Sequence, residues 1–254
     1  MPFSTFTAGS FLSYLWRACG AHGLHSPFVY SLCRQVIQQA DREHSAELDR
    51  VRNELLANRQ VIDIIDFKSG KTRRATVGDV AKSALSQAKF MHMLRLLSNY
   101  LQAEVVLETG SSLGLNARSL AGSETVRQVV SIEGSEIIHQ LARKTCEGSP
   151  KIELLSGNLY DLLEPTLVRY QPEVIFLDAD HRSSAIQYCL DKIMTHCPQV
   201  RCVVIHDIYW SHDMAAGWHS VVANPAFTLT IDVFQAGLLF PRYPIQKQHF
   251  TLRF

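Results

Sequence analysis

The sequence predicts an α/β fold in which a mostly parallel sheet is covered by helices and preceded by an N-terminal helical extension. The first observation is that, from residue 80 onward, short apolar runs alternate with amphipathic helical runs. The second is that these apolar runs are almost continuous, as expected of parallel strands buried on both faces. The third is that residues 227–254 contain three strand-like runs and almost no helix, which indicates an antiparallel hairpin at one sheet edge.

The composition is that of an ordinary globular protein. Hydrophobic residues make up 46% and charged residues 19% of the 254 residues, so the chain can bury a sizeable core. The formal net charge of +1 gives no overall field that favours nucleic acid or a membrane surface.

No apolar run approaches membrane-spanning length, and the first residues lack an early basic segment. We therefore expect no signal peptide, a cytoplasmic location and no membrane partner. Six cysteines at scattered spacings predict free thiols.

Residues 1–79 are interpreted as a helical extension with a basic loop, which caps the substrate side and is not an independent domain. Apolar residues at helical spacing predict helices through residues 9–57. Ser26 and Pro27 predict the N-cap and the first residue of one of these helices. A charged amphipathic run continues the helical pattern to residue 62. The polar, basic stretch at 66–79 then predicts a loop.

Residues 80–254 form the predicted α/β domain. A long amphipathic run predicts one helix over residues 80–101. Five buried strands are predicted at 104–108, 128–133, 151–157, 173–180 and 200–207. The helices that separate or follow them are predicted at 113–122, 135–148, 159–170 and 183–197. Near the C-terminus, apolar and polar residues alternate at 228–232 and 248–254, which favours antiparallel strands at one edge of the sheet.

Polar and acidic groups follow each of the five predicted strands. They are Glu108 with Gly110, Glu133, Asn158, Asp178 with His181, and His206 with Asp207. Taken singly, each is equally well explained as a solvated strand end or a helix cap. Because open parallel sheets bind ligands beyond the C-terminal ends of their strands, five such positions together favour a ligand site.

The turn "LETGSSLGLN" at 107–116 resembles a nucleotide-binding turn but lacks the dinucleotide pattern G-x-G-x-x-G. Its glycines, Gly110 and Gly114, are four residues apart and the middle glycine is missing. The carboxylate of Glu108 would repel a phosphate, whereas Glu133 at the end of the next strand could accept hydrogen bonds from both ribose hydroxyls. The pattern therefore favours a nucleoside with a cationic tail, S-adenosylmethionine, over NAD.

On these motifs, roughly residues 80–254 resemble the class I S-adenosylmethionine-dependent methyltransferases, in particular the catechol and caffeoyl-CoA O-methyltransferase-like group. "VVLETGSSLG" is similar to their first motif, "IFLDADHR" to their strand-four motif and "IHDIYWS" to their strand-five motif. The N-terminal "GAHGLHSPFVYSL" is similar to a bacterial subfamily of such proteins. The resemblance implies a Rossmann-like sheet in the order 3-2-1-4-5-7-6 with its last strand antiparallel.

The resemblance also implies which residues hold the cofactor. Glu108 and Gly110 would face its methionine part, and Gly114 would let a helix approach closely. Glu133 would hold the ribose, and Asn158 would lie near the adenine. The full expected set is Glu108, Gly110, Ser112, Gly114, Glu133, Asn158 and Asp178.

The expected catalytic residues are His181, Asp178 and His206. His181 stands where the resembled enzymes carry a lysine general base, and an ordinary histidine accepts a proton near neutral pH. His206 could do the same from the next strand; for both, a hydrogen-bonded histidine at a strand end is the alternative. Asp178 matches a metal-binding aspartate, and His206 with Asp207 replaces an Asp-Asn pair of ligands. A divalent metal on Asp178, His206 and Asp207 and the absence of any metal both stay open.

We therefore expect an enzyme that transfers a methyl group from S-adenosylmethionine to a small-molecule acceptor, at oxygen, by in-line displacement. The alternatives are an RNA or protein methyltransferase and a protein that binds S-adenosylmethionine without catalysis. A nucleic-acid partner is not expected, and a homodimer stays open.

Overall fold

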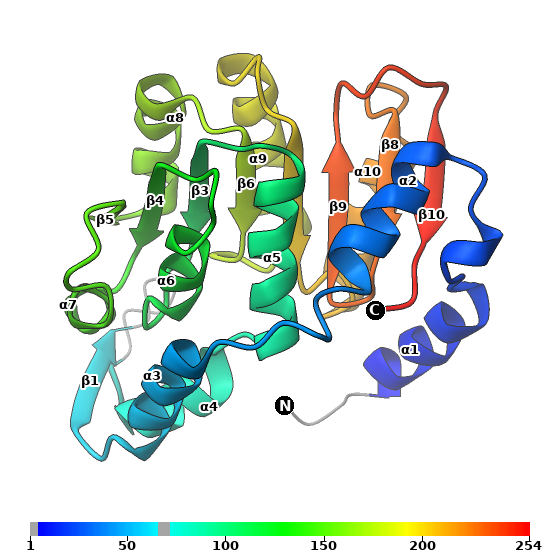
Figure 1. The fold of residues 1–254 in the computed structure, drawn as a ribbon. Coiled ribbons are helices and arrows are strands. Elements are labelled where there is room, and N and C mark those ends of the chain that lie inside the picture. The colour runs from blue at the N-terminus through cyan, green and yellow to red at the C-terminus, as the bar shows by residue number, and fades with distance from the viewer. Residues whose placement is uncertain (1–4, 66–71) are drawn as a thin grey trace. The chain divides into compact units, whose positions relative to one another are not determined.

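The computed structural model describes residues 5–65 and 72–254, which fold into two compact units (Figure 1). The first unit contains the described part of Met1–Gln39 together with Leu163–Phe254, and the second contains the described part of Ala40–Leu162. The sequence of the second unit is thus inserted between the two segments that form the first unit. The division into residues 1–79 and 80–254 that the sequence suggests stays a prediction.

The described part of the second unit contains three parallel strands in the order β3-β4-β5. They are β3 (Val105–Thr109), β4 (Gln128–Glu133) and β5 (Ile152–Ser156). Helices α6 (Leu115–Ala121) and α7 (Glu136–Thr145) connect them along the chain. Most residues of β3 and β4 are buried, which confirms that their continuous apolar runs are interior strands.

The N-terminal part of the second unit differs from the sequence prediction. The charged run forms α3 (Ala46–Ala57), which ends because Asn58 is extended, with φ −72° and ψ 115°. Instead of continuing the helix, Val61–Ile65 forms strand β1, since a run rich in β-branched side chains favours a strand. β1 pairs antiparallel with β2 (Thr72–Thr76). The predicted loop is therefore wrong from residue 72 onward, and its residues 66–71 lie outside the described chain.

The single helix predicted over residues 80–101 is in fact two helices, α4 (Val77–Ala84) and α5 (Ala88–Tyr100). Ser86 lies at the break, where its backbone oxygen accepts a hydrogen bond from Arg52. Its Oγ accepts another from Asn116 Nδ2 at 3.1 Å. Residues of α3 and α6 thus stabilise the break between α4 and α5. The periodicity of apolar residues in the sequence does not reveal such tertiary contacts.

The N-terminal segment of the first unit is helical but interrupted. Its elements are α1 (Thr5–Arg17), the 3-10 turn η1 (Ala21–Gly23), α2 (Pro27–Leu32) and the π-helical turn η2 (Cys33–Ile37). The predicted cap is confirmed, because Ser26 Oγ accepts from the Val29 N–H at 3.5 Å and Pro27 begins α2. The prediction of helices through residues 9–57 is wrong around Gly20 and Leu24, whose backbones are extended.

The described strands of the first unit follow the order β10-β8-β9-β7-β6. They are β6 (Val174–Leu177), β7 (Cys202–His206), β8 (Leu229–Asp232), β9 (Ala236–Phe240) and β10 (Gln248–Thr251). β6 and β7 are parallel, and β9 runs antiparallel to β7 and to β8, which confirms the predicted hairpin. β10 pairs with β8 in parallel. The expectation of antiparallel strands is therefore confirmed for 228–232, which pairs antiparallel with β9 as β8, and wrong for 248–254, because β10 joins β8 in parallel.

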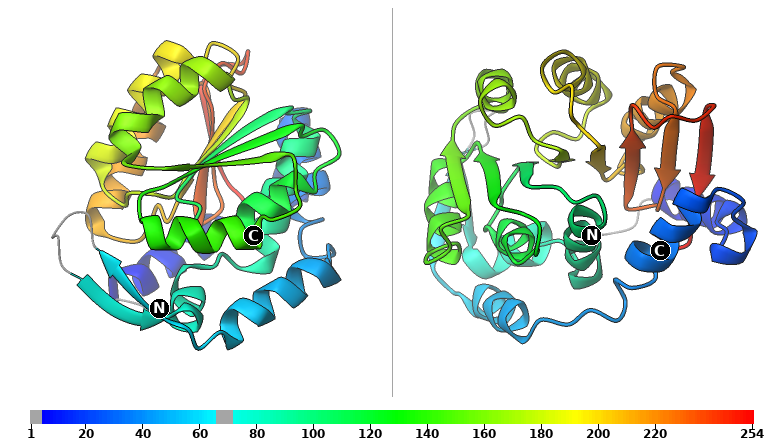
Figure 2. Two further views of the ribbon diagram at one scale, coloured as in Figure 1. Left: turned by 90° about the vertical axis from the view of Figure 1, so that its left-hand side faces the viewer. Right: turned by 45° about the horizontal axis from the view of Figure 1, so that its top comes forward.

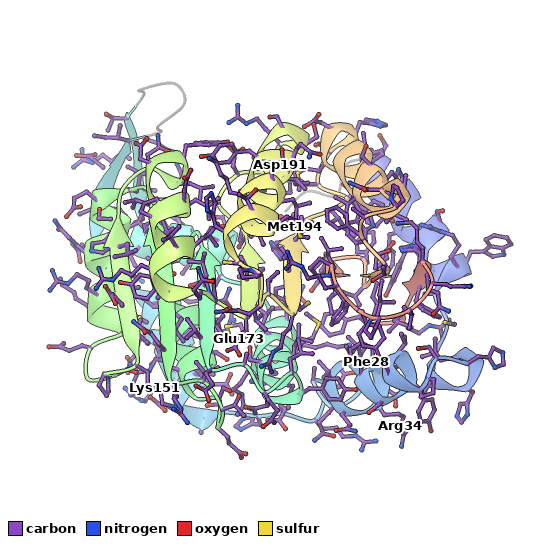
Figure 3. All side chains as sticks on the ribbon, turned by 90° about the horizontal axis from the view of Figure 1, so that it is seen from above. Phe28, Arg34, Lys151, Glu173, Asp191 and Met194 are labelled. Atoms are coloured by element: carbon purple, nitrogen blue, oxygen red, sulfur yellow. The ribbon has the colours of Figure 1, made fainter. Side chains whose placement is uncertain are left out.

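Helices cover both faces of this part of the sheet (Figures 1 and 2). Because side chains alternate along a strand, Gly237 and Phe240 of β9 point to opposite faces. Phe28 of α2, labelled in Figure 3, packs on Phe240 with ring centroids 5.3 Å apart. On the other face, a Cβ at Gly237 would lie 2.4 Å from the Trp218 ring of α10. The remaining helices of this segment are α8 (Leu159–Tyr170), α9 (Ser183–His196) and α10 (His212–Ala223).

Each unit reproduces its share of the predicted strand order. In the second unit, β5-β4-β3 corresponds to 3-2-1, and in the first, β6-β7-β9-β8 corresponds to 4-5-7-6. The predicted α/β, Rossmann-like fold class is confirmed, and β10 is an addition to it. None of the helices in the described chain is long and apolar enough to cross a membrane.

Candidate active site

The turn after β3 is built from residues in the left-handed backbone region. Gly110 has φ +88°, Ser112 has φ +48° and Gly114 has φ +82°. The Gly110 N–H donates to Ile132 O at 2.8 Å, and the Gly114 N–H donates to Ser111 O at 2.8 Å. Glycine adopts such angles at little cost, so the chain can bend sharply at the end of the strand. This is the edge at which open parallel sheets bind ligands.

The carboxylate of Glu133 joins this turn to the end of β4. Its Oε2 accepts from the Ser112 N–H and its Oε1 from the Ser135 N–H, each at 2.9 Å. Burial raises the pKa of Glu133, and the N–H groups of Ser135 and Ser112 offset only part of that rise. Each carboxylate oxygen can accept a second hydrogen bond. Glu133 is therefore placed to bind two neighbouring hydroxyls while staying fixed to the backbone.

Two serine hydroxyls of the turn, on Ser111 and Ser112, are buried and have no hydrogen-bond partner in the part of the chain that the structure describes. A buried hydroxyl left unsatisfied costs free energy, so a ligand or water that bonds to it is favoured there. Ser112 belongs to the predicted set. Ser111 does not belong to it, because two adjacent serines in one turn look alike in the sequence.

Glu108 is buried at the end of β3 and bonded to the neighbouring strand. Its side chain is fully buried, and its Oε2 accepts from Ser131 Oγ at 2.6 Å. Glu108 and Ser131 are register partners, so this bond braces β3 against β4. A direct contact between Glu108 and the cofactor stays a prediction, whereas its support of the strand that carries the turn is visible.

Gly114 and Asn158 both have local structural roles. A Cβ at Gly114 would lie 2.9 Å from Cys146 Sγ and 3.0 Å from Ala142 O, so glycine lets the α7 segment approach the turn. Asn158 caps α8, since its Oδ1 accepts from the Tyr160 N–H at 3.0 Å. The contacts with the cofactor that the resemblance implies for these two residues stay predictions.

In the first unit, the ends of β6 and β7 bring together two aspartates and His206. His206 Nδ1 lies 2.7 Å from Asp178 Oδ1 and 3.8 Å from Asp207 Oδ2. Burial alone would lower the pKa of His206, but the charge and hydrogen bond of Asp178, helped by Asp207, raise it to about 9. His206 is therefore protonated at neutral pH and donates to Asp178. A cationic imidazole cannot accept a proton, so His206 is poorly suited to act as the general base.

His181 faces the same two carboxylates from the loop after β6. Its Nε2 lies 3.5 Å from Asp207 Oδ2 and 3.8 Å from Asp178 Oδ1. These distances suit electrostatic attraction but exceed those of strong hydrogen bonds. Nε2 therefore makes no strong hydrogen bond to either carboxylate. Its ring meets Trp210 edge-on with centroids 5.7 Å apart, and Trp210 is 45% exposed. His181 thus has carboxylate support and an aromatic neighbour that is open to solvent.

The expected metal ligands are close to one another but do not form a ligand set. Asp178 Oδ1 is already bonded to His206 Nδ1. Within residues 5–65 and 72–254, no group of three or more His, Cys, Asp or Glu side chains is arranged to hold a metal ion.

A buried polar chain beside these residues was not predicted from the sequence. Tyr209 Oη donates to Asp232 Oδ2 at 2.5 Å and accepts from Arg17 Nη2 at 3.3 Å. Asp232 is fully buried, and its Oδ1 also accepts from the Phe234 N–H at 2.8 Å. These bonds fix the loop that carries Trp210. Arg17 and Tyr209 are 192 positions apart, so no local pattern could have joined them.

No protein-family model and no curated protein matches the chain. Solved structures do. A methyltransferase from Podospora anserina bound to SAH matches with a TM-score of 0.60 and 12% identity, over 87% of this chain and 99% of that one. An O-methyltransferase from Bacillus cereus in complex with SAH matches with a TM-score of 0.57 and 17% identity, over 80% and 94%. An O-methyltransferase from Streptomyces achromogenes, involved in tomaymycin synthesis and in complex with SAM, matches with 0.54 and 15%, over 78% and 89%.

At these identities the likeness establishes the fold, and a fold does not by itself determine a function. The chain has the Rossmann-like α/β fold of these methyltransferases.

Proposed function

We propose that the protein is an S-adenosylmethionine-dependent methyltransferase that methylates an oxygen of a small molecule. The observation that carries the proposal is the turn of residues 110–114 with Glu133 bonded to it. The turn combines left-handed backbone, unsatisfied hydroxyls and an anchored carboxylate at the C-terminal end of a parallel strand. The fold likeness to solved O-methyltransferases supports the same class.

The residues of the second unit fit this cofactor better than a dinucleotide. Glu133 offers two acceptor oxygens for the ribose hydroxyls, and Ser111 and Ser112 offer hydroxyls for the polar end of the methionine part. The carboxylates of Glu108 and Glu133 favour a sulfonium and disfavour a pyrophosphate, because opposite charges attract across a partly buried turn.

The first unit supplies the groups for proton removal. His181 is the proposed general base, which takes the proton of the acceptor hydroxyl through Nε2. Asp207 and Asp178, 3.5 Å and 3.8 Å from that nitrogen, stabilise the imidazolium that results. His206 is bonded to Asp178 and keeps its carboxylate in place. When bound, S-adenosylmethionine supplies a methyl group on a sulfonium, so that the new O–C bond forms as the C–S bond breaks and S-adenosylhomocysteine leaves.

The acceptor is proposed to be a small phenol, whose hydroxyl is attached directly to an aromatic ring. Trp210 presents a half-exposed indole beside His181, and a flat apolar surface next to a base suits a phenolic ring. Methyl transfer to RNA or protein remains the rival activity, and cofactor binding without turnover is the rival without catalysis.

The experiment measures S-adenosylhomocysteine released from S-adenosylmethionine with a panel of phenols and catechols. We expect turnover on at least one acceptor, and His181→Ala should lower kcat by about 10²–10⁴-fold, the usual share of general base catalysis. Affinity for S-adenosylhomocysteine should be unchanged. His219, exposed on α10, provides the matched control as His219→Ala. Cofactor binding without turnover on any acceptor would instead favour the non-catalytic protein, and equal kcat in both variants would remove His181 as the base.

A further inference from the structure

Helix α1 turns an apolar stripe outward. Leu12 is 68% exposed, Leu15 is 38% exposed and Trp16 is 89% exposed. These three residues share one side of the helix, because successive positions are about 100° apart and residues three or four apart are neighbours. We call them the α1 stripe. A helix packed on a protein surface normally turns polar residues to water, so the α1 stripe is the reverse of the usual arrangement.

The opposite side of α1 is fixed to the first unit. Tyr14 is buried, its Oη donates to Leu252 O at 2.6 Å, and it accepts from the Phe254 N–H at 2.9 Å. The Tyr14 ring also packs on Phe234 with centroids 5.3 Å apart, and Phe11, which lies at the flank of the stripe one turn before Leu15, packs on the same ring at 4.9 Å. Rotation of α1 about its axis to bury the stripe would break these contacts. The stripe is therefore held in a fixed, solvent-facing orientation.

The segments around the stripe carry cations and no acidic residues. Residues 1–40 and 233–254 contain no Asp or Glu, so all 24 acidic residues of the chain fall in residues 41–232. These segments contain five cations, Arg17, Arg34, Arg242, Lys247 and Arg253. Arg17 belongs to α1 and Arg253 is bonded to Cys19 just after it, whereas Arg242 and Lys247 donate to backbone oxygens elsewhere in the unit. The two segments meet in space, because the Arg253 N–H donates to Cys19 O at 3.0 Å and the Cys19 N–H donates to Thr251 O at 3.0 Å. Arg34, labelled in Figure 3, lies in η2, just after α2.

The contacts of α1 also bring it near an exposed acidic residue, Asp213. The Phe6 ring packs against His212 at a tilt of 39° with centroids 3.8 Å apart, and Asp213 follows His212 in α10. Both oxygens of Asp213 are bonded to Ser183, to its N–H at 2.7 Å and its Oγ at 2.6 Å. That carboxylate lies beside the N-terminal end of α1, whereas Leu15, Trp16 and Arg17 are at its C-terminal end.

We propose that the α1 stripe binds the surface of a lipid bilayer that contains anionic lipids. Exposed Trp and Leu on a helix enter the headgroup region of a bilayer, and cations beside them, here Arg17 and Arg253, are attracted to its negative surface. The other candidate occupant is a second copy of this chain. A symmetric dimer would place the same cationic segments against each other, which is unfavourable. The formal net charge of +1 concealed this surface, because the acidic residues are confined to the middle of the chain.

This proposal does not depend on methyl transfer, and its test needs no activity. The full chain is mixed with vesicles of phosphatidylcholine alone or with an equal share of phosphatidylglycerol, and bound protein is measured by flotation. We expect binding to the anionic vesicles. The double variant Leu12→Ser/Trp16→Ser should lower the partition coefficient about tenfold or more. Arg253→Gln should lower it about fivefold on anionic vesicles only.

Val168→Ser is the matched control, because Val168 is 55% exposed on α8 of the same unit and should leave binding unchanged. Thermal unfolding checks that the variants fold, and Leu12→Ser alone replaces the double variant if that does not. The proposal is overturned if the wild-type chain fails to bind anionic vesicles or if the stripe variants bind them as well as it does. A dimer that the double variant dissociates in sedimentation equilibrium, with no vesicle binding, would assign the stripe to a second copy.

Discussion

His206 shows how burial and charge compete at a single residue. Removal of an imidazolium from water favours its neutral form, whereas the Asp178 carboxylate 2.7 Å away favours the cation. The carboxylates prevail and raise the pKa of His206 to about 9 from an ordinary value of 6.5. The ion pair therefore contributes to folding stability only where His206 is charged in the folded chain.

This gives a prediction for stability against pH. Since the folded pKa lies above the unfolded one, the stabilisation is fully present below pH 6.5 and is lost as the pH rises through about 9. The free energy of unfolding, measured by urea at pH 6 and at pH 9.5, should differ between wild type and His206→Gln more at pH 6. The change in that difference should be on the order of 2–3 kcal/mol. An equal difference at both pH values would contradict the cation at His206.

Sequence reasoning reached some of these residues because topology alone places them. Asp178, His181 and His206 follow strands of a parallel sheet, so their types and positions could be read without coordinates. Which histidine is held as a cation depends on a distance to Asp178, and a distance cannot be read from a sequence. The chain of hydrogen bonds from Arg17 to Asp232 was missed for the same reason.

At the scale of elements, the approach of α7 to the turn after β3 depends on Gly114. Two separate effects favour glycine there: the φ of +82° and the 2.9 Å and 3.0 Å distances that a Cβ would have to Cys146 Sγ and Ala142 O. Gly148 has the same φ of +82° with nothing within 4 Å. The two glycines therefore separate backbone strain from steric clash.

We predict that Gly114→Ala destabilises the protein more than Gly148→Ala. Both lose the left-handed conformation that suits glycine, at about 1–2 kcal/mol. Gly114→Ala adds an overpacking cost of about 1–3 kcal/mol, because backbone atoms of Ala142 must move. Thermal or urea unfolding of the two variants measures the difference. Equal losses of stability would mean that α7 gives way to the added methyl group.

The elements that were predicted correctly are those with a strong local pattern. The apolar runs of β3, β4, β6 and β7 identify interior strands, and Ser26 with Pro27 identifies the start of α2. The errors fall where distant contacts decide. β1 replaces the end of a predicted helical run and its partner β2 replaces part of a predicted loop. Ser86 divides a predicted helix, and β10 joins β8 in parallel. Strand partners are chosen by tertiary contacts, to which a run of residues gives no direct clue.

At the scale of the whole molecule, the two units divide the predicted roles. The expected cofactor residues other than Asp178 belong to the second unit, and Asp178, His181 and His206 belong to the first. Acidic residues are distributed unevenly along the chain, since none occurs in residues 1–40 or 233–254, although the first unit also contains acidic residues between 163 and 232. The net charge of +1, an average over the chain, does not show this distribution.

The central claim is that the turn of residues 110–114 and Glu133 bind S-adenosylmethionine. Isothermal titration calorimetry with S-adenosylhomocysteine and with NAD tests it most directly. We predict binding of S-adenosylhomocysteine in preference to NAD. Glu133→Ala should weaken that affinity on the order of 10–100-fold, since hydrogen bonds to a charged group are lost. The exposed Glu147, as Glu147→Ala, should have no effect. No binding of S-adenosylhomocysteine, or tighter binding of NAD, would contradict the account.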